Sequence, residues 1–392
     1  MAEKYRILTL NNISPAGLAR LPSERYIIGS DVAEPDAILV RSAKMHEMVI
    51  PASVKAIGRA GAGTNNIPVA KMSERGVPVF NAPGANANAV KELVIAGMLI
   101  AARNLMPAWQ FAESLLGEDA EIAKAVEAGK KNYTGIELPG RTLGVIGLGA
   151  IGSLVADAGI RLGMNVIGFD PEITVDAAWR LPATVKKATS VEEVVKNSDF
   201  ISLHVPLLDK TRNMIDAARI ALMKPGAVLL NFAREGIVDD KAVVEGIAAG
   251  RLRGYVCDFP SNALKGNPRI VAFPHLGAST QEAEENCAVM VAEQVRDYLE
   301  NGNILNAVNF PNVSMVRESA WRIAIANVNV PNMVGQISTA MAEAGLNIHN
   351  MVNKSKGEMA YTLVDVDSEP TQAVIGRIAA IKGVLMVRAI PA

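Results

Sequence analysis

Short apolar runs alternate with helical or turn segments through the first 82 residues. The runs cover residues 6–10, 26–29, 37–41, 56–59 and 77–80. Continuous apolar runs of this length, bounded by turn residues, are typical of strands buried on both faces of a parallel sheet. We therefore predict a small parallel α/β unit with its own core in this part of the chain.

The middle of the chain shows the same alternation on a larger scale. A long apolar segment, 90–102, and a charged one, 109–131, predict two helices that lead into a second α/β unit. A glutamate- and alanine-rich helix over 279–301 is expected to return to the first unit. We therefore predict a discontinuous substrate-binding domain, 1–95 with 279–312, around a dinucleotide-binding domain at 96–278. Strands of the second unit are predicted at 143–146, 164–169, 200–204, 228–232, 254–259 and 270–273.

The tail has a different rhythm, in which strands alternate apolar and polar positions. Strands are predicted at 322–326, 347–353, 360–366 and 384–389, with helices at 334–344 and 370–381. This βαββαβ order predicts a ferredoxin-like domain over residues 317–392, joined by a linker at about 303–314. The pattern alone leaves a packing or dimerisation role and a ligand-sensing role equally open.

Composition and charge exclude several classes of protein. Half of the residues are hydrophobic but only 4% are aromatic, which suits parallel sheets covered by helices. Lys and Arg total 39 against 40 for Asp and Glu, so no overall charge favours nucleic acid or a membrane surface. The chain has no apolar run long enough for a membrane span, and Cys257 and Cys287 have no metal-site spacing. We expect a cytoplasmic protein without a metal site.

A glycine-rich segment follows the strand predicted at 143–146. Gly147, Gly149 and Gly152 form G-x-G-x-x-G between that strand and a helix, and the next strand ends at Asp170. In the dinucleotide-binding fingerprint the first glycine makes the turn, the second admits the pyrophosphate and the third allows close packing. Asp170 can bind a ribose, and because no arginine follows it, NAD is favoured over NADP. The alternative is a glycine-rich turn beside a surface aspartate.

Two polar side chains follow other strands of the predicted dinucleotide-binding sheet. Arg234 lies in Asn231-Phe-Ala-Arg234, and His275 lies in Phe273-Pro-His275. An arginine can hold a carboxylate with two hydrogen bonds, and a histidine can exchange a proton with an alcohol near neutral pH. Beside a nicotinamide, these roles predict hydride transfer between a 2-hydroxy acid and a 2-oxo acid.

Other polar residues carry weaker predictions. His204 ends a further predicted strand and Pro206 follows it, where they would shape the cofactor loop or have a purely structural role. Arg41 and Arg59 end strands of the first unit and are candidate anion ligands, although isolated arginines are usually solvated. Asn86 opens the helix at 90–102, where its spacing favours a helix cap.

Several motifs resemble those of the D-2-hydroxyacid dehydrogenase family, and the resemblance covers nearly the whole chain. It is closest to the branch that acts on 3-phosphoglycerate, and the tail resembles the ACT regulatory domain. The resemblance implies an α/β fold with a flavodoxin-like substrate domain, a Rossmann NAD-binding domain and a ferredoxin-like ACT domain. The motifs are Leu39-Val-Arg41-Ser42-Ala43, Gly58-Arg59-Ala60-Gly61, Asn81-Ala-Pro83 with Asn86 and Glu92, His275-Leu-Gly-Ala-Ser-Thr280, Asn329-Val-Pro331 and Gly345-Leu-Asn347-Ile348.

This resemblance implies NAD-dependent oxidation of 3-phosphoglycerate to 3-phosphohydroxypyruvate, the first step of L-serine biosynthesis. Arg234 would hold the carboxylate, and His275 would be the acid/base. L-Serine or another amino acid could act on the tail, and we expect a homo-oligomer. The implied NAD contacts are Ala150, Ile151, Asp170, Ala233, Asp258 and Gly277; the implied ligands of the phosphorylated substrate are Arg41, Ser42, Arg59 and Asn86; the implied effector residues are Asn327, Asn329 and Asn347.

The sequence departs from the family at two places. The family has a glutamate that orients the catalytic histidine, whereas here the run Asp258-Phe-Pro-Ser-Asn262 is one residue shorter. We expect Asn262 near the place of that glutamate, where it could accept a hydrogen bond from the ring but not supply a full charge. In the tail, the family's His-x-Asn-x-Pro-Gly becomes Asn327-Val-Asn329-Val-Pro331-Asn332.

Two other functions fit the same residues. A dehydrogenase of another 2-hydroxy acid would share Arg234 and His275 but would not depend on Arg41 or Arg59. An NAD-sensing binding protein would explain the missing glutamate, but the presence of both Arg234 and His275 argues against it.

Overall fold

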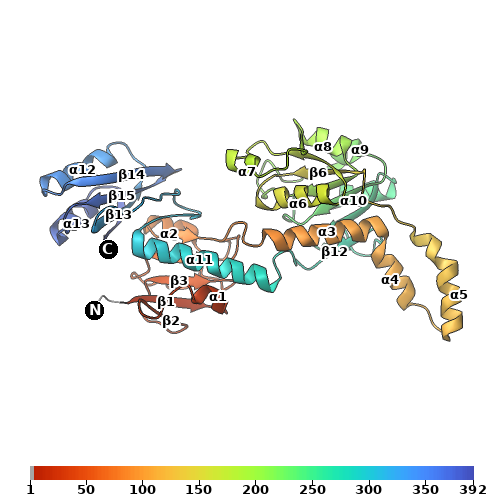
Figure 1. Cartoon of the computed structure of the whole chain (residues 1–392), viewed down its shortest axis with the longest axis horizontal. Coiled ribbons are helices and arrows are strands. Elements are labelled where there is room, and N and C mark those ends of the chain that lie inside the picture. Colours follow the sequence, from red (N-terminus) through yellow and green to blue (C-terminus); the bar gives the residue numbers. More distant parts are fainter. Residues whose placement is uncertain (1–3) are drawn as a thin grey trace. The chain divides into compact units, whose positions relative to one another are not determined.

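The computed structural model describes residues 4–392, which divide into two compact units (Figure 1). The first unit combines the residues up to 85 with residues 281–392, and the second consists of residues 86–280. The first unit is therefore discontinuous in sequence. The boundary differs from the one predicted at residue 95, because the whole of α3 (Ala87–Arg103) packs against the second sheet, with Val94 and Met98 in its core.

The first unit contains a five-stranded parallel sheet of order β2-β1-β3-β4-β5, which is the flavodoxin-like order. Its two faces bury alternate residues of the same strands. Ile7 and Leu39 pack with α11 (Gln281–Asn301), whereas Leu8 and Ile38 pack with α2 (Val69–Glu74). The strands are β1 (Tyr5–Leu10), β2 (Tyr26–Gly29), β3 (Ala37–Val40), β4 (Ala56–Arg59) and β5 (Val79–Phe80), and a short helix α1 (Pro15–Leu18) follows β1.

The second unit contains a seven-stranded parallel sheet of order β12-β11-β10-β9-β6-β7-β8. Helices α3 and α6 pack on one face, and α8, α9 and α10 pack on the other. Both faces are covered, which explains why the strands read as continuous apolar runs. The elements are β6 (Thr142–Ile146), α6 (Ala150–Arg161), β7 (Asn165–Phe169), α7 (Val175–Trp179), β8 (Lys186–Lys187), α8 (Val191–Asn197), β9 (Phe200–Leu203), α9 (Ala217–Leu222), β10 (Ala227–Asn231), α10 (Asp240–Ala248), β11 (Leu252–Cys257) and β12 (Ile270–Ala272).

The single helix predicted over 109–131 is wrong. The structure has α4 (Leu105–Glu113), α5 (Asp119–Gly129) and a short 3₁₀ helix, η1 (Lys130–Tyr133). Gly117 has a φ of 123°, and Glu118 forms a capping box that starts α5. A glycine in this conformation followed by a helix start ends the periodic pattern that the prediction continued.

The tail forms a four-stranded antiparallel sheet of order β14-β15-β13-β16, which confirms the predicted βαββαβ order. One face packs on its two helices, with Ile323 and Ile337 in that core. The other face shares a core with the rest of the first unit, where Tyr361 lies near Tyr298 of α11. The elements are β13 (Trp321–Val328), α12 (Met333–Glu343), β14 (Ile348–Lys356), β15 (Met359–Val366), α13 (Gln372–Ala379) and β16 (Val384–Pro391).

The predicted linker is packed rather than extended. Ile304 and Val313 exchange backbone hydrogen bonds of 2.8 Å, and the side chain of Phe310 is buried. The Asn309 side chain accepts a hydrogen bond from the Val79 amide at 2.9 Å, which attaches this segment to the edge of the first sheet. In the part of the chain that the structure describes, no helix is both long and apolar enough to cross a membrane.

Candidate active site

The three glycines of the fingerprint have three different environments. Gly147 follows β6 with a φ of 90°, and a Cβ there would lie 2.4 Å from the carbonyl oxygen of His204. A Cβ at Gly152, in the first turn of α6, would lie 1.9 Å from the carbonyl oxygen of Gly147. A Cβ at Gly149 would meet nothing within 4 Å. The loop therefore turns at the first glycine, packs tightly at the third and is open at the second, as a dinucleotide pyrophosphate requires.

Asp170 ties this loop to the end of the neighbouring strand β7. Its Oδ2 accepts a hydrogen bond from the Leu148 amide, and its Oδ1 accepts one from the Glu172 amide, each at 2.9 Å. An ionised carboxylate has further lone pairs, so these two bonds fix its position and leave acceptor capacity for a ribose. Ala150 and Ile151 begin α6 beside it, where the helix presents free amides to an anion.

His204, directly after β9, is half-buried. Its Nε2 lies 2.8 Å from the hydroxyl of Ser202, while its buried Nδ1 has no hydrogen-bond partner among the described residues. Burial disfavours the charged ring and lowers the pKa of His204 to about 3. The ring is therefore neutral near neutral pH. Two residues later, the carbonyl oxygen of Pro206 accepts a hydrogen bond from the Thr211 hydroxyl at 2.6 Å, so both residues fix the loop after β9.

Arg234 is held by a turn at the carboxyl end of β10. The buried Asn231 accepts a hydrogen bond from the Ala233 amide at 3.2 Å and donates one to the Arg234 carbonyl at 2.9 Å. The Arg234 side chain is exposed, and its Nη1 donates to the Ala233 carbonyl at 2.7 Å. The backbone is thus fixed while the guanidinium faces solvent.

The segment that carries His275 is held by a buried carboxylate. Asp258, directly after β11, is 1% exposed and accepts hydrogen bonds from the Leu276 and Gly277 amides, each at 2.7 Å. Its carbonyl accepts a bond from the His275 amide at 3.1 Å. His275 has a φ of 57°, a left-handed conformation that is uncommon for a residue other than glycine. Such conformations persist where the surroundings impose them, and they cluster at functional sites.

The imidazole of His275 is exposed and lies against Phe259, with ring centroids 5.2 Å apart and an interplanar angle of 64°. The expectation that Asn262 could orient this ring is not met. Asn262 is exposed in the turn after β11, and no hydrogen bond joins it to His275 in the described part of the chain. The aromatic edge and the Asp258 carboxylate hold this segment instead.

In the first unit, Arg41 follows β3 and forms an ion pair with Glu284 of α11. Both side chains are about two-fifths exposed, at 41% and 42%, and both line a cavity of about 300 Å³. The turn at Ser42 is fixed by Asn11, whose Oδ1 accepts hydrogen bonds from the amides of residues 42 and 43 at 3.0 and 2.7 Å.

Arg59 ends β4, with its guanidinium against the chain at Gly61. A Cβ on Gly61, whose φ is 151°, would lie 1.5 Å from Nη1 of Arg59, so only glycine leaves room for this side chain. Asn86 belongs to the second unit and directly precedes α3, as predicted, but its side chain makes no capping hydrogen bond. Its φ of −98° and ψ of 9° are unlike the extended backbone that a capping asparagine adopts.

The asparagines of the tail do not form one cluster within the chain. Asn327 is buried and donates to the Val328 carbonyl at 2.8 Å, and Asn329 donates to the Gly357 carbonyl at 3.1 Å, at the turn between β14 and β15. Asn347 precedes β14 at the other end of the sheet, where Ile348 pairs with Val366. The sheet register therefore separates Asn347 from the other two.

Sequence reasoning missed three residues that shape these sites: Asn11, Asn231 and Glu284. Asn231 carried a signal, since it is a polar residue directly after the apolar run 228–230. Glu284 carried none, because its pairing with Arg41 joins residues 243 positions apart.

The glycine loop, Asp170 and the strand order define a dinucleotide-binding domain, and comparison with known proteins identifies its family. Residues 96–277 match the model of the D-isomer specific 2-hydroxyacid dehydrogenase NAD-binding domain. A D-3-phosphoglycerate dehydrogenase of Haemophilus influenzae is 34% identical over 347 residues, which cover 85% of this chain and 80% of the relative. The chain therefore belongs to the D-isomer specific 2-hydroxyacid dehydrogenases, and its cofactor is NAD.

Other relatives carry the same name or share the fold. A D-3-phosphoglycerate dehydrogenase of Methanocaldococcus jannaschii is 40% identical over 291 residues, 72% of this chain. This chain spans about half of that relative, 53%, and a similar share, 50%, of the Synechocystis D-3-phosphoglycerate dehydrogenase. The structure of NAD⁺-bound 3-phosphoglycerate dehydrogenase from Entamoeba histolytica matches with a TM-score of 0.60 and 25% identity, covering 78% of this chain and 98% of that one.

Proposed function

We propose that this protein uses NAD to oxidise 3-phosphoglycerate to 3-phosphohydroxypyruvate, the first step of L-serine biosynthesis. The observation that carries the proposal is the placement of Arg234 and His275. Arg234 follows β10 and His275 follows β12, the two strands on either side of β11, at the carboxyl edge of the sheet that holds the open Gly149 loop. Ligands of open parallel sheets bind at this edge. The curated relatives named D-3-phosphoglycerate dehydrogenase support the choice of substrate.

Each residue has a role that follows from its chemistry. The nicotinamide, when bound, accepts the hydride from C2 of the substrate. The neutral imidazole of His275 takes the hydroxyl proton in oxidation, and the protonated ring returns it in reduction. The Arg234 guanidinium binds the substrate carboxylate with two parallel hydrogen bonds. Asp258 is a positioning residue, because both of its carboxylate oxygens accept amides of the segment that carries His275.

The remaining assignments divide between cofactor and substrate. We assign the phosphorylated substrate to Arg41, Ser42, Arg59 and Asn86, with Arg59 as the residue that reads its phosphate. We assign NAD to the three fingerprint glycines with Ala150, Ile151, Asp170, Ala233 and Gly277, and we place His204 and Pro206 beneath them as supports of the loop.

We also propose that the tail is an ACT regulatory domain that binds L-serine or another amino acid. Because Asn347 lies at the opposite end of the sheet from Asn327 and Asn329, a site that used all three would need a second tail. A homo-oligomer is supported by exposed apolar residues near α4, where Trp109 is 57% and Leu116 is 91% exposed. We place this assembly in the cytoplasm.

Substrate choice can be tested with NADH oxidation by 3-phosphohydroxypyruvate, beside hydroxypyruvate, glyoxylate and 2-oxoglutarate. We expect the phosphorylated acid to be preferred. The variant Arg59→Gln should raise KM for it by roughly 10- to 150-fold, the equivalent of one charge-assisted hydrogen bond. It should leave KM for hydroxypyruvate nearly unchanged, because that acid has no phosphate.

His275→Asn serves as the control for the chemical step. Its kcat should fall by about 10²–10⁴-fold, the usual contribution of general acid–base catalysis, while NADH binding is retained. If Arg59→Gln raised KM for 3-phosphohydroxypyruvate and for hydroxypyruvate by the same factor, the natural substrate would be another 2-hydroxy acid. NADH binding without any turnover would favour an NAD-sensing protein.

A further inference from the structure

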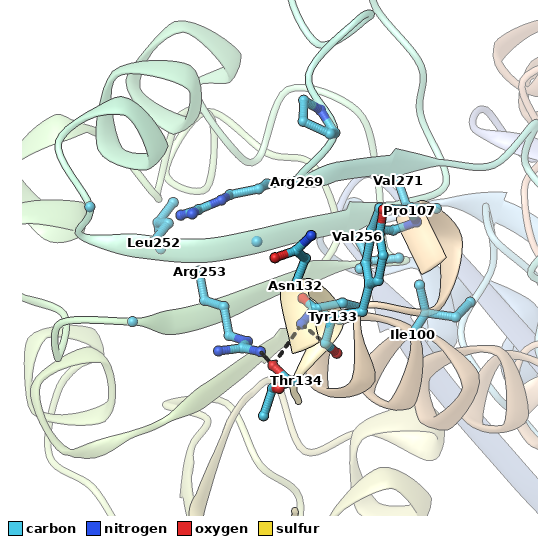
Figure 2. A pocket seen from close by; sticks show the side chains of 16 residues that line it. Ile100, Pro107, Asn132, Tyr133, Thr134, Leu252, Arg253, Val256, Arg269 and Val271 are labelled. Carbon is cyan, nitrogen blue, oxygen red and sulfur yellow. Dashed lines mark hydrogen bonds between the residues drawn. The ribbon is translucent and has the colours of Figure 1, made fainter. Parts of the chain in front are cut away.

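The second unit contains a cavity of about 490 Å³ at the edge of its sheet opposite to the fingerprint (Figure 2). Gly226 directly precedes β10, Leu252 begins β11 and Arg269 directly precedes β12, so the cavity lies at the amino ends of these strands. The NAD loop and His275 follow the carboxyl ends. The cavity is therefore separate from the site described above, and its volume is within the range of small-molecule sites.

The lining of this cavity is basic. Figure 2 shows Arg253 and Arg269 beside it, with Asn132 and Tyr133 from the segment after α5. No aspartate or glutamate belongs to the set of described residues that line it. Burial, and then the charges of Arg141 and Arg269, lower the pKa of Arg253, so both of these arginines lie close enough to repel its charge.

The protein itself offers the Arg253 guanidinium few hydrogen-bond acceptors. Its Nε is buried and has no hydrogen-bond partner in the described part of the chain. Its Nη2 reaches the Thr134 carbonyl only at 3.5 Å, a long contact for a charged donor. A buried donor without an acceptor costs free energy. An anion in the cavity would accept hydrogen bonds from the Nη groups of Arg253 and would offset the charge repulsion that it feels.

We propose that this cavity binds a small organic anion, a phosphate ester or a carboxylate, through Arg253 and Arg269. The two guanidinium groups offer planar pairs of donors that match the oxygens of either group. Asn132 and Tyr133 add neutral polar contacts on the opposite side. Such a ligand would be an effector rather than a reactant, because β11 has Arg253 at its amino end and Asp258 just after its carboxyl end.

The proposal can be tested by modification of arginines with phenylglyoxal, read residue by residue by mass spectrometry. The full-length protein is saturated with NADH, and inorganic phosphate or succinate is added in separate series. Arg269 is exposed, so the reagent reaches it. At ten times the half-protecting concentration, either anion should slow modification of Arg269 by about tenfold. Protection by phosphate alone or by succinate alone would identify which acidic group the site accepts.

Arg161, on α6, is the internal control, because its side chain is 78% exposed and does not line the cavity. Its rate of modification should not change with either anion. The variant Arg253→Gln should raise the anion concentration that half-protects Arg269 by roughly 10- to 150-fold, whereas Arg161→Gln should leave it unchanged. Equal rates at Arg269 with and without both anions would overturn the proposal. Protection of Arg269 that increased with protein concentration rather than with anion concentration would also overturn it, because it would show that a second copy of the chain covers this surface.

Discussion

At the scale of single residues, the conformation of His275 shows how this chain fixes the backbone of the residue that we propose as the acid/base. Its left-handed backbone is held by bonds from its amide to the carbonyls of Asp258 and Phe273, at 3.1 and 3.0 Å. The next two amides bond to the carboxylate of the same aspartate. One buried residue thus offsets a conformation that costs on the order of 1–3 kcal/mol.

His204 gives a prediction about stability and pH. The pKa of its ring is about 3 in the folded protein, against an ordinary value of 6.5. Below about pH 6.5 the unfolded chain takes up a proton that the folded protein refuses, so stability is lost as the pH falls from there toward 3. Between about pH 6.5 and about pH 5 this loss amounts to about 2 kcal/mol.

The measurement compares the free energy of unfolding in urea at about pH 7.5 and about pH 5 for the wild type and His204→Gln. Other groups titrate in both proteins and cancel in the comparison. The variant should lose about 2 kcal/mol less than the wild type. Equal losses would mean that the ring is protonated inside the folded protein.

Prediction from sequence succeeded at residues whose role is local and failed where it depends on a distant partner. The fingerprint glycines were found because the turn, the open position and the helix contact lie within six residues of chain. The pairing of Arg41 with Glu284 was not found, because it forms only when α11 packs against the first sheet. Asn262 was misplaced for a related reason, because alignment by spacing does not show that a turn carries its side chain into solvent.

At the scale of elements, the loop between β6 and α6 gives a second prediction. Gly149→Ala adds a Cβ where no atom of the described residues lies within 4 Å, and its φ of −71° suits any residue. The fold should tolerate this change. NADH affinity should fall by about tenfold, or about 1.4 kcal/mol, because the new methyl group occupies the approach of the pyrophosphate.

Gly152→Ala, three residues further, is the matched control. Its Cβ would lie 1.9 Å from the Gly147 carbonyl oxygen, so the helix and strand must move apart. The free energy of unfolding should fall by about 1–3 kcal/mol. Thermal unfolding and titration of NADH fluorescence separate the two effects. A Gly149→Ala protein with full NADH affinity would place the pyrophosphate elsewhere.

The strands of both parallel sheets were predictable because burial on two faces leaves continuous apolar runs. The division of 109–131 into separate helices was not predictable, because the apolar and charged periodicity continues through the break at Gly117 and Glu118. Periodicity reports which side of a helix is apolar, but it does not report where the backbone turns.

At the scale of the whole molecule, a buried charge attaches the tail to the rest of the first unit. The side chains of Arg322 and Asp365 are fully buried and bond at 2.6 and 3.0 Å. Arg322 also donates to the carbonyls of Asn301 and Met315, each at 3.0 Å, at the end of α11 and before β13. These bonds cross the boundary that the sequence placed at residue 317.

We expect Asp365→Ala to lower the free energy of unfolding by about 3–5 kcal/mol, because it leaves the Arg322 charge buried without its carboxylate. The control is Glu343→Ala in the exposed pair with Arg377, which is 56% and 62% exposed and should cost about 0–1 kcal/mol. Urea denaturation of the two variants makes the comparison. Losses of similar size would show that the Arg322 pair does not hold the tail in place.

The division of the chain also has a consequence for protein synthesis. The second unit is one continuous stretch, residues 86–280, inserted into the first. The core of the first unit includes Val291 and Tyr298 of α11, which the ribosome adds only after the whole second unit has been made. Domains generally fold as units during translation. The inserted domain can therefore fold while the sheet encoded before it still waits for the helix that covers one of its faces.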